Sequence, residues 1–315
     1  MRPTNQHPTT DRHSGLIARS LAYAEAHLDE PLTAEILADH AALSRHHFHR
    51  VFRAYIGCSV ANYVTWLRLR RAFALLVSGT ESVSEIALAV GYESAQALAK
   101  AMRRDFDTTP SAVRRGGAPA YENFLQPPTE HRFRPNPEGA IDMQVTRMTA
   151  LPDGIIALTA TARGMVGNTM MRAAQQAYGE LFKAVNRVGL RDQVTSYLSV
   201  VPDDPKGPDD PHCRFIAGLV FGYSLAASSG RPLQPSGISL SDSMSWQHIA
   251  SGRYAVFTHI GSYSTLHLTW KSIYRDWLPA SDQRLRDAPP MELNLNRPET
   301  TPRDALRTEI WLPVA

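Results

Sequence analysis

The stretch SRHHFHRVFRAYIGCSV, residues 44–60, decides the fold, because its pattern returns as SAQALAKAMRRDFDTTP at residues 94–110. In each copy, the residues four and eight positions after a serine are apolar. This is the spacing of an N-capped helix with one buried face. The matched positions are Ser44, Phe48, Phe52, Arg53 and Ser59 in the first copy and Ser94, Leu98, Met102, Arg103 and Thr109 in the second. A shorter helical segment and a tight turn precede each copy, so the sequence predicts two helix-turn-helix units.

A helix-turn-helix unit places its second helix in the major groove of DNA. Two such helices in one chain can enter successive grooves on one face of the duplex, about 34 Å apart. The repeat over residues 14–115 therefore predicts that a single chain recognises double-stranded DNA.

The charge distribution agrees with this prediction. The formal net charge is +3, and residues 1–120 contain 14 Lys and Arg against 11 Asp and Glu, whereas residues 121–315 contain 19 of each kind. Seven of the twelve histidines also lie in the first segment, at positions 7, 13, 27, 40, 46, 47 and 49. Protonation of these rings as the pH falls through about 6.5 adds positive charge. The total excess is modest, so phosphate attraction must come from local clusters.

Length and composition set further bounds. With 315 residues, 43% of them hydrophobic and 20% charged, the chain is long enough for two hydrophobic cores. Its two cysteines, Cys58 and Cys213, exclude a disulfide framework and fit a reducing compartment. The N-terminal sequence lacks the apolar segment of a signal peptide, and no run of about eighteen apolar residues occurs. We therefore expect a cytoplasmic protein without a membrane partner.

The first half of the chain is predicted to be all helical. Residues 1–13 are expected to be a disordered tail, and residues 60–77 a long helix that links the two units. The predicted boundary residues are Ser14 and Pro31 for the first helix, Thr33 for a short second helix, Ser44 and Gly57 for the third, Gly91 for the turn of the second unit, and Thr109-Pro110 for the last helix.

The second half has a different pattern, separated by a Gly- and Pro-rich linker over residues 117–140. Strands are predicted near 142–149, 154–161, 194–201, 214–222, 245–249, 253–259, 291–296 and 307–313, and helices at 169–188 and 264–278. Each long helix is followed by strands, which indicates a strand-helix-strand-strand unit used twice in an α+β domain. The expected domains are therefore residues 14–116 and 141–315.

In the first repeat, five cationic or potentially cationic side chains are expected to point away from the buried face of the helix. They are Arg45, His46, His49, Arg50 and Arg53. Arg50 is best suited to a bidentate contact to guanine, whereas Arg53 is expected to meet a phosphate. A solvated polar face would explain one such helix, but its repetition favours contact with DNA.

The second repeat has fewer groups that can read bases. Gln96 can pair with adenine, Lys100 can reach a base or a phosphate, and Ala95 and Ala99 offer methyl contacts. Arg103 repeats the position of Arg53. We expect this helix to discriminate less between sequences than the first.

The segment HHFH also raises the alternative of a zinc site, because His46 and His49 are one helical turn apart. No cysteine or carboxylate lies nearby at matching spacing. The sequence therefore predicts no metal site and no cofactor.

Residues 14–115 resemble the DNA-binding domain of the AraC/XylS family. The resemblance rests on the six-residue step from Ala38 to Ser44, the long connecting helix, the segment IALAVGYES and the closing TTPSAVR, which occur in order with matching gaps. It implies that base contacts fall on His46, His49 and Arg50 in the first helix and on Ser94, Ala95, Gln96, Ala99 and Lys100 in the second. The family commonly has Phe where this chain has Leu98 and Met102, and usually Gly at Asp107; these changes preserve core volume.

Residues 142–315 resemble a GyrI-like effector-binding domain. The matching pieces are SGRYAVFTHIGSY at 251–263, the helix with Trp270, Tyr274 and WLP at 277–279, MELNLN at 291–296 and EIWLPV at 309–314. Over residues 142–248 the resemblance is weaker, with the insertion-like PDDPKGPDDPH as its main marker. The resemblance implies a small-molecule effector, and this domain order occurs in a known group of regulators.

Aromatic residues of the second half can line an apolar pocket for such an effector. They are Tyr197, Phe221, Tyr223, Trp246, Phe257, Tyr263, Trp270, Tyr274 and Trp277. The alternative is that the rings belong to the core, which we expect for at least half of them and most clearly for Trp277. The predicted effector contacts are Tyr197, Phe221, Tyr223, Trp246, Tyr263, Trp270 and Glu292.

Glu292 is the most informative of these residues. Alternation in MELNLN puts Met291, Leu293 and Leu295 on one face of a strand and Glu292 on the other. A carboxylate in an aromatic cavity selects organic cations, and the GyrI-like resemblance implies an effector-contacting Glu at this motif. The alternative is a solvent-facing Glu on an edge strand.

The sequence thus predicts a transcriptional regulator, not an enzyme, that binds DNA, responds to a small organic effector and has RNA polymerase as a further expected partner. One alternative is hydrolysis of small electrophiles by Glu292 with Tyr263 or Tyr254 as acid and base. Another is a protein-binding module whose GyrI-like half engages a partner such as gyrase. Neither a nucleophile triad nor a phosphate loop is visible in the sequence, so sensing is the simpler function.

Overall fold

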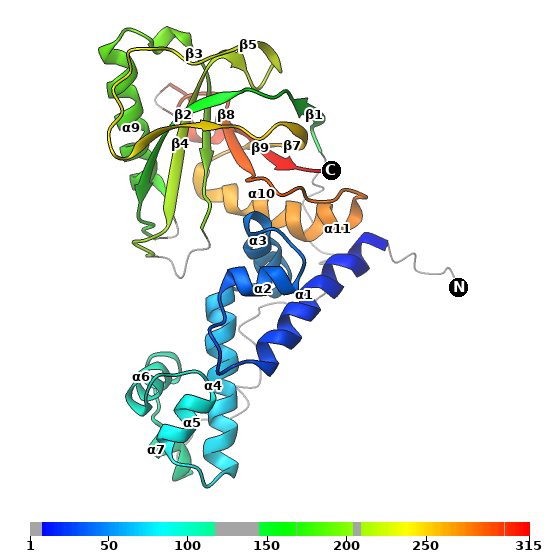
Figure 1. Cartoon of the computed structure of the whole chain (residues 1–315), viewed down its shortest axis with the longest axis vertical. Coiled ribbons are helices and arrows are strands. Elements are labelled where there is room, and N and C mark those ends of the chain that lie inside the picture. The colour runs from blue at the N-terminus through cyan, green and yellow to red at the C-terminus, as the bar shows by residue number, and fades with distance from the viewer. Residues whose placement is uncertain (1–7, 117–144, 168, 204–208, 299) are drawn as a thin grey trace. The chain divides into compact units, whose positions relative to one another are not determined.

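The computed structural model describes residues 8–116, 145–167, 169–203, 209–298 and 300–315. The described residues from 10 to 116 form one compact unit and those from 145 to 315 another (Figure 1). The predicted linker and residues 1–7 of the predicted tail lie outside the described residues. Within the described ranges, none of the helices combines the length and the apolar character needed to cross a membrane.

The first unit is all helical, as predicted. Its helices are α1 Pro8–Ala26, α2 Ala34–His40, α3 Arg45–Ile56, α4 Val60–Ser78, α5 Val83–Ala89, α6 Ala95–Phe106 and α7 Pro110–Arg114. The predicted bounds of the first helix are wrong at both ends, because α1 begins at Pro8, six residues before Ser14, and ends at Ala26, five residues before Pro31. Proline is favoured in the first turn of a helix, where its missing N–H costs nothing.

The long helix α4 carries both helix-turn-helix modules: the first module, α2 and α3, and the second module, α5 and α6. On its first half, Tyr63 packs edge-on against Phe52 of α3, with ring centroids 5.6 Å apart. Its second half shares a buried core with α5, α6 and α7, made of Leu69, Ala72, Phe73, Leu76, Ile86, Ala87, Val90, Leu98, Ala101, Met102 and Val113. The 19 residues of α4 extend about 28 Å, close to the rise of one turn of DNA.

The described part of the second unit is built on a nine-stranded antiparallel sheet. Its order is β1-β7-β9-β8-β3-β4-β2-β6, with β5 paired to β4. The strands are β1 Arg147–Leu151, β2 Ile156–Arg163, β3 Val194–Val200, β4 Arg214–Ser224, β5 Ser229–Leu233, β6 Met244–His248, β7 Gly252–Ile260, β8 Met291–Asn294 and β9 Arg307–Pro313.

Two copies of a strand-helix-strand-strand unit make up the centre of this sheet, which confirms the predicted α+β fold. The first copy is β2, α9 Met171–Arg187, β3 and β4; in the second copy, β7 is followed by α10 Leu266–Ser272, a π-helical turn Ile273–Trp277 and α11 Leu278–Ala280, and then by β8 and β9. In both copies the first strand pairs with the last, and the last with the middle one. The two middle strands, β3 and β8, pair with each other at the centre.

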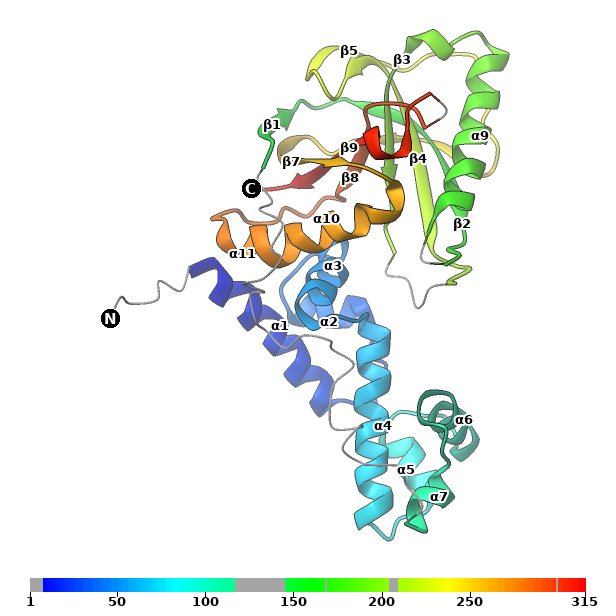
Figure 2. The same cartoon turned by 180° about the vertical axis from the view of Figure 1, so that it is seen from behind.

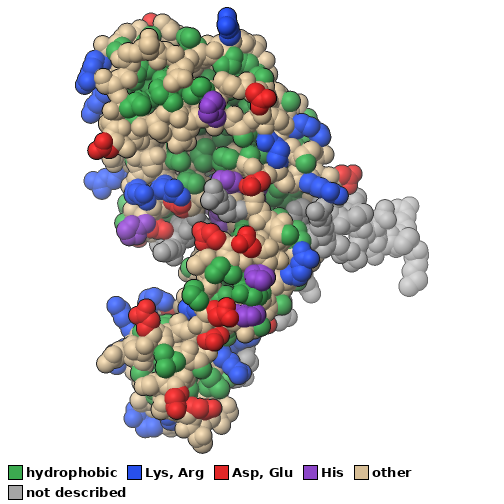
Figure 3. All heavy atoms as spheres, viewed as in Figure 1, with side chains coloured by type: hydrophobic (Ala, Val, Ile, Leu, Met, Phe, Trp, Pro, Cys, Tyr) green, Lys and Arg blue, Asp and Glu red, His purple; other side chains and the backbone are tan. Residues whose placement is uncertain are grey.

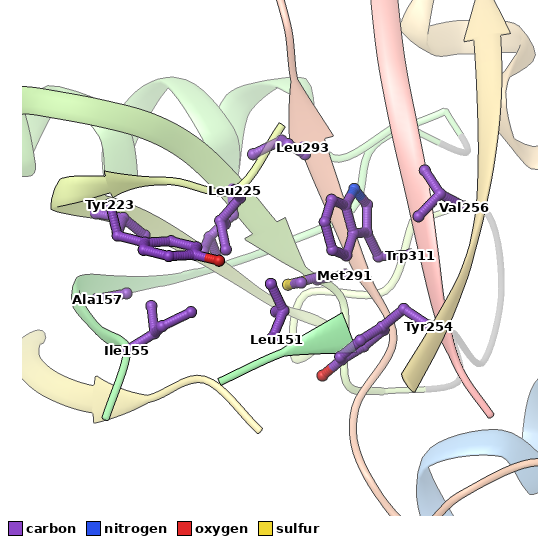
Figure 4. Packing of buried hydrophobic residues seen from close by; sticks show 12 residues of the cluster. Leu151, Ile155, Ala157, Tyr223, Leu225, Tyr254, Val256, Met291, Leu293 and Trp311 are labelled. Atoms are coloured by element: carbon purple, nitrogen blue, oxygen red, sulfur yellow. The ribbon is translucent and has the colours of Figure 1, made fainter. Parts of the chain in front are cut away.

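The sheet has two buried faces. On the helix face, α9 lies over β2 and β4, and its apolar residues pack between them (Figure 2). On the opposite face, side chains from β1, β4, β7, β8 and β9 point toward one another (Figure 4). The curl of the sheet buries this face: the Thr149 hydroxyl on β1 is 3.1 Å from the Ser228 hydroxyl after β4, although the two strands are five places apart.

Candidate nucleic-acid interface and ligand site

The candidate reading helix of the first module, α3, begins and ends where the sequence predicts. Ser44 is its N-cap residue, and Gly57 ends it with a left-handed φ of 90°. Phe48 and Phe52 are buried, with ring centroids 5.6 Å apart. The Ser44 hydroxyl does not bond to the backbone of α3. Ser44 therefore occupies the N-cap position without making the usual side-chain hydrogen bond.

The predicted outward orientation of the α3 cations holds only in part. Arg53 is exposed and His46 and Arg50 are half-buried, but His49 is only 8% exposed, which corrects the prediction for this ring. His49 lies at the edge of the apolar face, because Phe52 and Ile56 follow it by three and seven positions. The side chain of Arg45 lies outside the described atoms.

The second candidate reading helix, α6, presents a clear polar face. Gln96, Lys100 and Arg103 are spaced by four and three residues and are all exposed, whereas Ala95 and Ala99 are half-buried. Figure 3 shows Lys and Arg side chains, with Asp and Glu among them, over the end of this unit that carries α5, α6 and α7. This face combines amide and cationic donors, which is the chemistry that base edges and phosphates accept.

The N-cap residue of α6, Ser94, makes the side-chain hydrogen bond that Ser44 of α3 lacks. The Ser94 hydroxyl accepts a hydrogen bond from the backbone N–H of Ala97 at 3.2 Å. Ser94 therefore orders the first turn of the helix, while its predicted contact with a base remains a prediction.

The turns that join the two helices of each module share one backbone geometry. Ala42 and Gly91 both adopt left-handed φ values, 49° and 79°. Each turn is closed by a hydrogen bond from the following residue, Leu43 N–H to Ala38 at 3.1 Å and Tyr92 N–H to Ala87 at 2.8 Å. This is the helix-ending motif that favours glycine.

The candidate ligand site centres on Glu292, on the helix face of β8. Trp270 of α10 donates its indole N–H to Glu292 Oε1 at 2.7 Å, and the buried Ser199 hydroxyl of β3 donates to Oε2 at 3.1 Å. The Trp270 ring stacks on Tyr274, with centroids 5.9 Å apart and planes at 18°. Glu292 is half-buried, so the alternative of a solvent-facing edge residue is wrong.

A second polar group beside Glu292 was missed by the sequence analysis. The Tyr178 hydroxyl of α9 donates to the Leu198 carbonyl at 2.7 Å and accepts from the Asn294 amide at 3.3 Å. Burial raises the pKa of Tyr178, and the nearby Glu292 and Tyr263 raise it further. Tyr178 is therefore a neutral hydrogen-bonding group at the site, held by the centre of the sheet.

Sequence models of two protein families match the chain. A helix-turn-helix domain model matches residues 37–116, and a GyrI-like small molecule binding domain model matches residues 156–315, about half of the chain. The regulatory protein SoxS of Escherichia coli K12 is 30% identical over 102 residues, which cover 32% of this chain and 95% of SoxS. The chain belongs to the AraC family of transcriptional regulators.

Other AraC-family similarities cover the same helical part. The HTH-type transcriptional regulator ArgR of Pseudomonas aeruginosa is 32% identical over 113 residues, 35% of this chain and 34% of ArgR. This chain thus spans about a third of the length of ArgR but nearly all of SoxS. A crystal structure of a transcriptional regulator with an AraC-type DNA-binding domain from Chromobacterium violaceum is 30% identical, covering 33% of this chain and 94% of that one, with a TM-score of 0.32.

Not every aromatic residue predicted for the effector site of this AraC-family chain lies near Glu292. Tyr223 is on the opposite face of the sheet, because a bulge at Gly222, with a φ of 72°, separates it from Phe221. Phe221 is fully buried on the helix face against Trp246. Trp246 is on β6, four strands and about 19 Å along the sheet from β8. These three residues belong to the core, which corrects their assignment to the pocket.

Three of the predicted residues besides Glu292 do lie around it. Trp270 donates a hydrogen bond to Glu292, and Tyr197 is the cross-strand neighbour of Asn294. Tyr263 is close enough to raise the pKa of Tyr178. Cross-strand neighbours on one face have Cβ atoms about 5 Å apart. The site of this AraC-family protein therefore combines one carboxylate, aromatic rings and neutral hydrogen-bonding groups from both copies of the duplicated unit.

Proposed function

We propose that this protein is a sequence-specific DNA-binding transcriptional regulator controlled by a small organic molecule bound in its GyrI-like domain. The observation that carries the first part is the placement of α3 and α6. Each is the second helix of a helix-turn-helix module, and the two modules pack on successive halves of α4. One chain then supplies two reading helices to neighbouring major grooves.

The proposed base contacts come from His46 and Arg50 in α3 and from Gln96 and Lys100 in α6; His49 is buried and is not among them. Arg53 and Arg103, exposed near the ends of the two helices, are proposed to contact phosphates. Ser94, Ala95 and Ala99 complete the second surface, and Arg45 the first.

The proposed effector is an organic cation. Within the part of the chain that the structure describes, the Glu292 carboxylate receives two neutral hydrogen bonds and forms no ion pair. A half-buried negative charge without a cationic partner is costly, and a bound cation relieves that cost. The stacked rings of Trp270 and Tyr274 add flat aromatic surface beside the carboxylate.

A hydrolase function is supported less well. Tyr254, one of the two tyrosines that the sequence offered as a partner of Glu292, lies on the opposite face of the sheet and donates its hydroxyl to the Ala250 carbonyl at 2.7 Å. The chain's relatives SoxS and ArgR are regulators. We therefore propose that Glu292 binds a ligand and does not activate water, and that ligand binding changes DNA affinity or contact with RNA polymerase.

The DNA-binding proposal is tested by selecting fragments of the source genome and measuring fluorescence anisotropy at several salt concentrations. We expect preferential binding to particular fragments that weakens steeply with salt, and a further loss in Lys100→Ala/Arg103→Ala. Arg19→Ala is the matched control, because Arg19 is an exposed cation on α1, which is neither of the two reading helices. Equal binding to selected and random fragments would contradict the proposal.

The ligand proposal is tested by titrating the purified chain with the fluorescent cation tetramethylrhodamine methyl ester. Glu292→Gln keeps the size and one hydrogen-bond acceptor of the side chain but removes its charge, so we expect at least about tenfold weaker binding. Asp153→Asn is the matched control, an exposed carboxylate in the same unit. Unchanged affinity in Glu292→Gln would contradict the proposed site.

A further inference from the structure

Beside the Glu292 site, two aromatic rings are flanked by two arginines. The Arg191 guanidinium carbon is 3.7 Å from the centroid of the Phe182 ring of α9. Phe182 meets Tyr197 of β3 edge-on, with centroids 6.1 Å apart. The Arg297 guanidinium lies 5.7 Å from the Tyr197 ring and donates to the Tyr197 hydroxyl at 3.2 Å. We call these four residues the arginine shelf.

The arginine shelf carries positive charge that the described residues do not neutralise. Arg191 is half-buried and Arg297 exposed, and neither forms an ion pair within the described ranges. Both guanidiniums are oriented by aromatic rings, which leaves N–H groups available to another partner. An oriented guanidinium suits a carboxylate, because the two groups form paired, charge-assisted hydrogen bonds.

The register of the sheet places the arginine shelf next to the Glu292 carboxylate. Tyr197 pairs with Asn294, which follows Glu292 by two residues on the same face of β8, about 7 Å along the strand. On α9, Phe182 follows Tyr178 by one helical turn, and Tyr178 accepts from Asn294. Negative and positive groups therefore lie at neighbouring places on one face, roughly 10 Å apart.

We propose that the effector is amphoteric: an aromatic organic cation that also carries a carboxylate, with its cation at Glu292 and its carboxylate at Arg297. This inference rests on the proposed function, and it narrows the ligand class from cations in general to cations with an anionic arm. Arg297 then determines specificity, because a cation without a carboxylate contacts Glu292 but has no group that Arg297 binds. Arg191 adds to the positive potential at the far end of the shelf.

Two dyes that differ in one charge test this proposal. Tetramethylrhodamine with a free carboxylate is amphoteric, and its methyl ester is a cation of almost the same shape. We expect the whole 315-residue chain to bind the free acid at least about tenfold more tightly than the ester. In Arg297→Gln this preference should be lost while the affinity for the ester stays the same, and the exposed Arg231→Gln on β5 should behave like the wild type.

The outcomes separate this inference from the proposed function. Equal affinities for the two dyes, a preference for the ester, or a preference that survives Arg297→Gln would overturn the amphoteric ligand and leave the cation site intact. Ester binding that is absent, or unchanged by Glu292→Gln, would overturn the cation site and the amphoteric ligand with it. Arg297 is exposed, so its replacement leaves the core untouched.

Discussion

The two helix-turn-helix modules have nearly the same backbone but are specified by different chemistry. In the second module the turn residue is Gly91 and the Ser94 hydroxyl caps α6, so local geometry is favourable at both places. In the first module the turn residue is Ala42, in the same left-handed region, and the Ser44 hydroxyl makes no cap. The first module instead holds more of the His and Arg residues.

The features that stabilise a module and the features that recognise DNA are therefore found mainly in different modules. The module with the better local geometry has the plainer polar face, and the module with the richer cationic helix carries the strained turn and the incomplete cap. We infer that α6 serves mainly as a well-formed anchor and that α3 contributes more of the sequence discrimination. Substitutions at matched positions of the two modules test this division.

The largest effect is expected from Gly91→Ala. A Cβ atom there would lie 2.2 Å from the Leu28 carbonyl oxygen and 2.7 Å from Arg68 Nη2, and the left-handed φ itself costs about 1–2 kcal/mol. Arg68 Nε donates to that same carbonyl at 3.0 Å, so the clash also disturbs this contact. We expect a loss of more than about 3 kcal/mol in the free energy of unfolding, measured by chemical denaturation. A loss under about 1 kcal/mol would show that the turn is not rigid.

Next in size is the difference between Arg50→Ala and Lys100→Ala in DNA binding. A bidentate arginine contact to guanine contributes about 1–3 kcal/mol of discrimination, so removing Arg50 should reduce the preference for the cognate site. Removing Lys100 should weaken binding to all sequences more evenly. Competition binding with cognate and point-mutated sites measures both effects, and the reverse order would contradict the division between the modules.

A smaller effect is expected at the two N-caps. Ser94→Ala removes a hydrogen bond to the α6 backbone and should lower the free energy of unfolding by about 1 kcal/mol. Ser44→Ala removes a hydroxyl that makes no such bond and should cost less than about 0.5 kcal/mol. Thermal denaturation of both variants provides the comparison. Equal losses would show that Ser44 caps α3 in solution.

An effect of opposite sign is expected from Ala42→Gly. This exposed residue has a φ of 49°, where glycine is not strained but alanine is. The greater freedom of glycine in the unfolded chain offsets part of the gain, so we expect stabilisation by no more than about 1 kcal/mol. Denaturant titration tests this, and destabilisation would mean that the strain at Ala42 is negligible.

The sequence predicted the helical unit well, because its signals are local. Serine and threonine caps, Gly57, Gly91 and the apolar spacing mark each boundary without reference to distant residues. Helix α1 was the exception at both ends: proline can begin a helix as well as end one, and α1 ends at Ala26, before Pro31 is reached. Strand β5 was also missed, because its sequence SGRPL has the composition of a turn.

The ligand site was predicted only in part, because it depends on the order of strands in the sheet. Glu292 follows from alternation within one strand, but nothing in the sequence shows that β6 lies four strands from β8 and so removes Trp246 from the site. The bulge at Gly222, which turns Tyr223 to the opposite face, is equally hidden. Tyr178 was missed because its main partner is a backbone carbonyl of β3.

The most direct test of the account is the spacing between the two halves of the DNA site. Once footprinting has located the two contacted grooves, five base pairs can be inserted between them, which rotates one half by about half a turn of the duplex. Because α3 and α6 are fixed on one α4 helix, affinity for the altered site should fall at least about tenfold, and a full-turn insertion should not restore it. Affinity that is unchanged by the insertion would contradict simultaneous binding by both helices of a single chain.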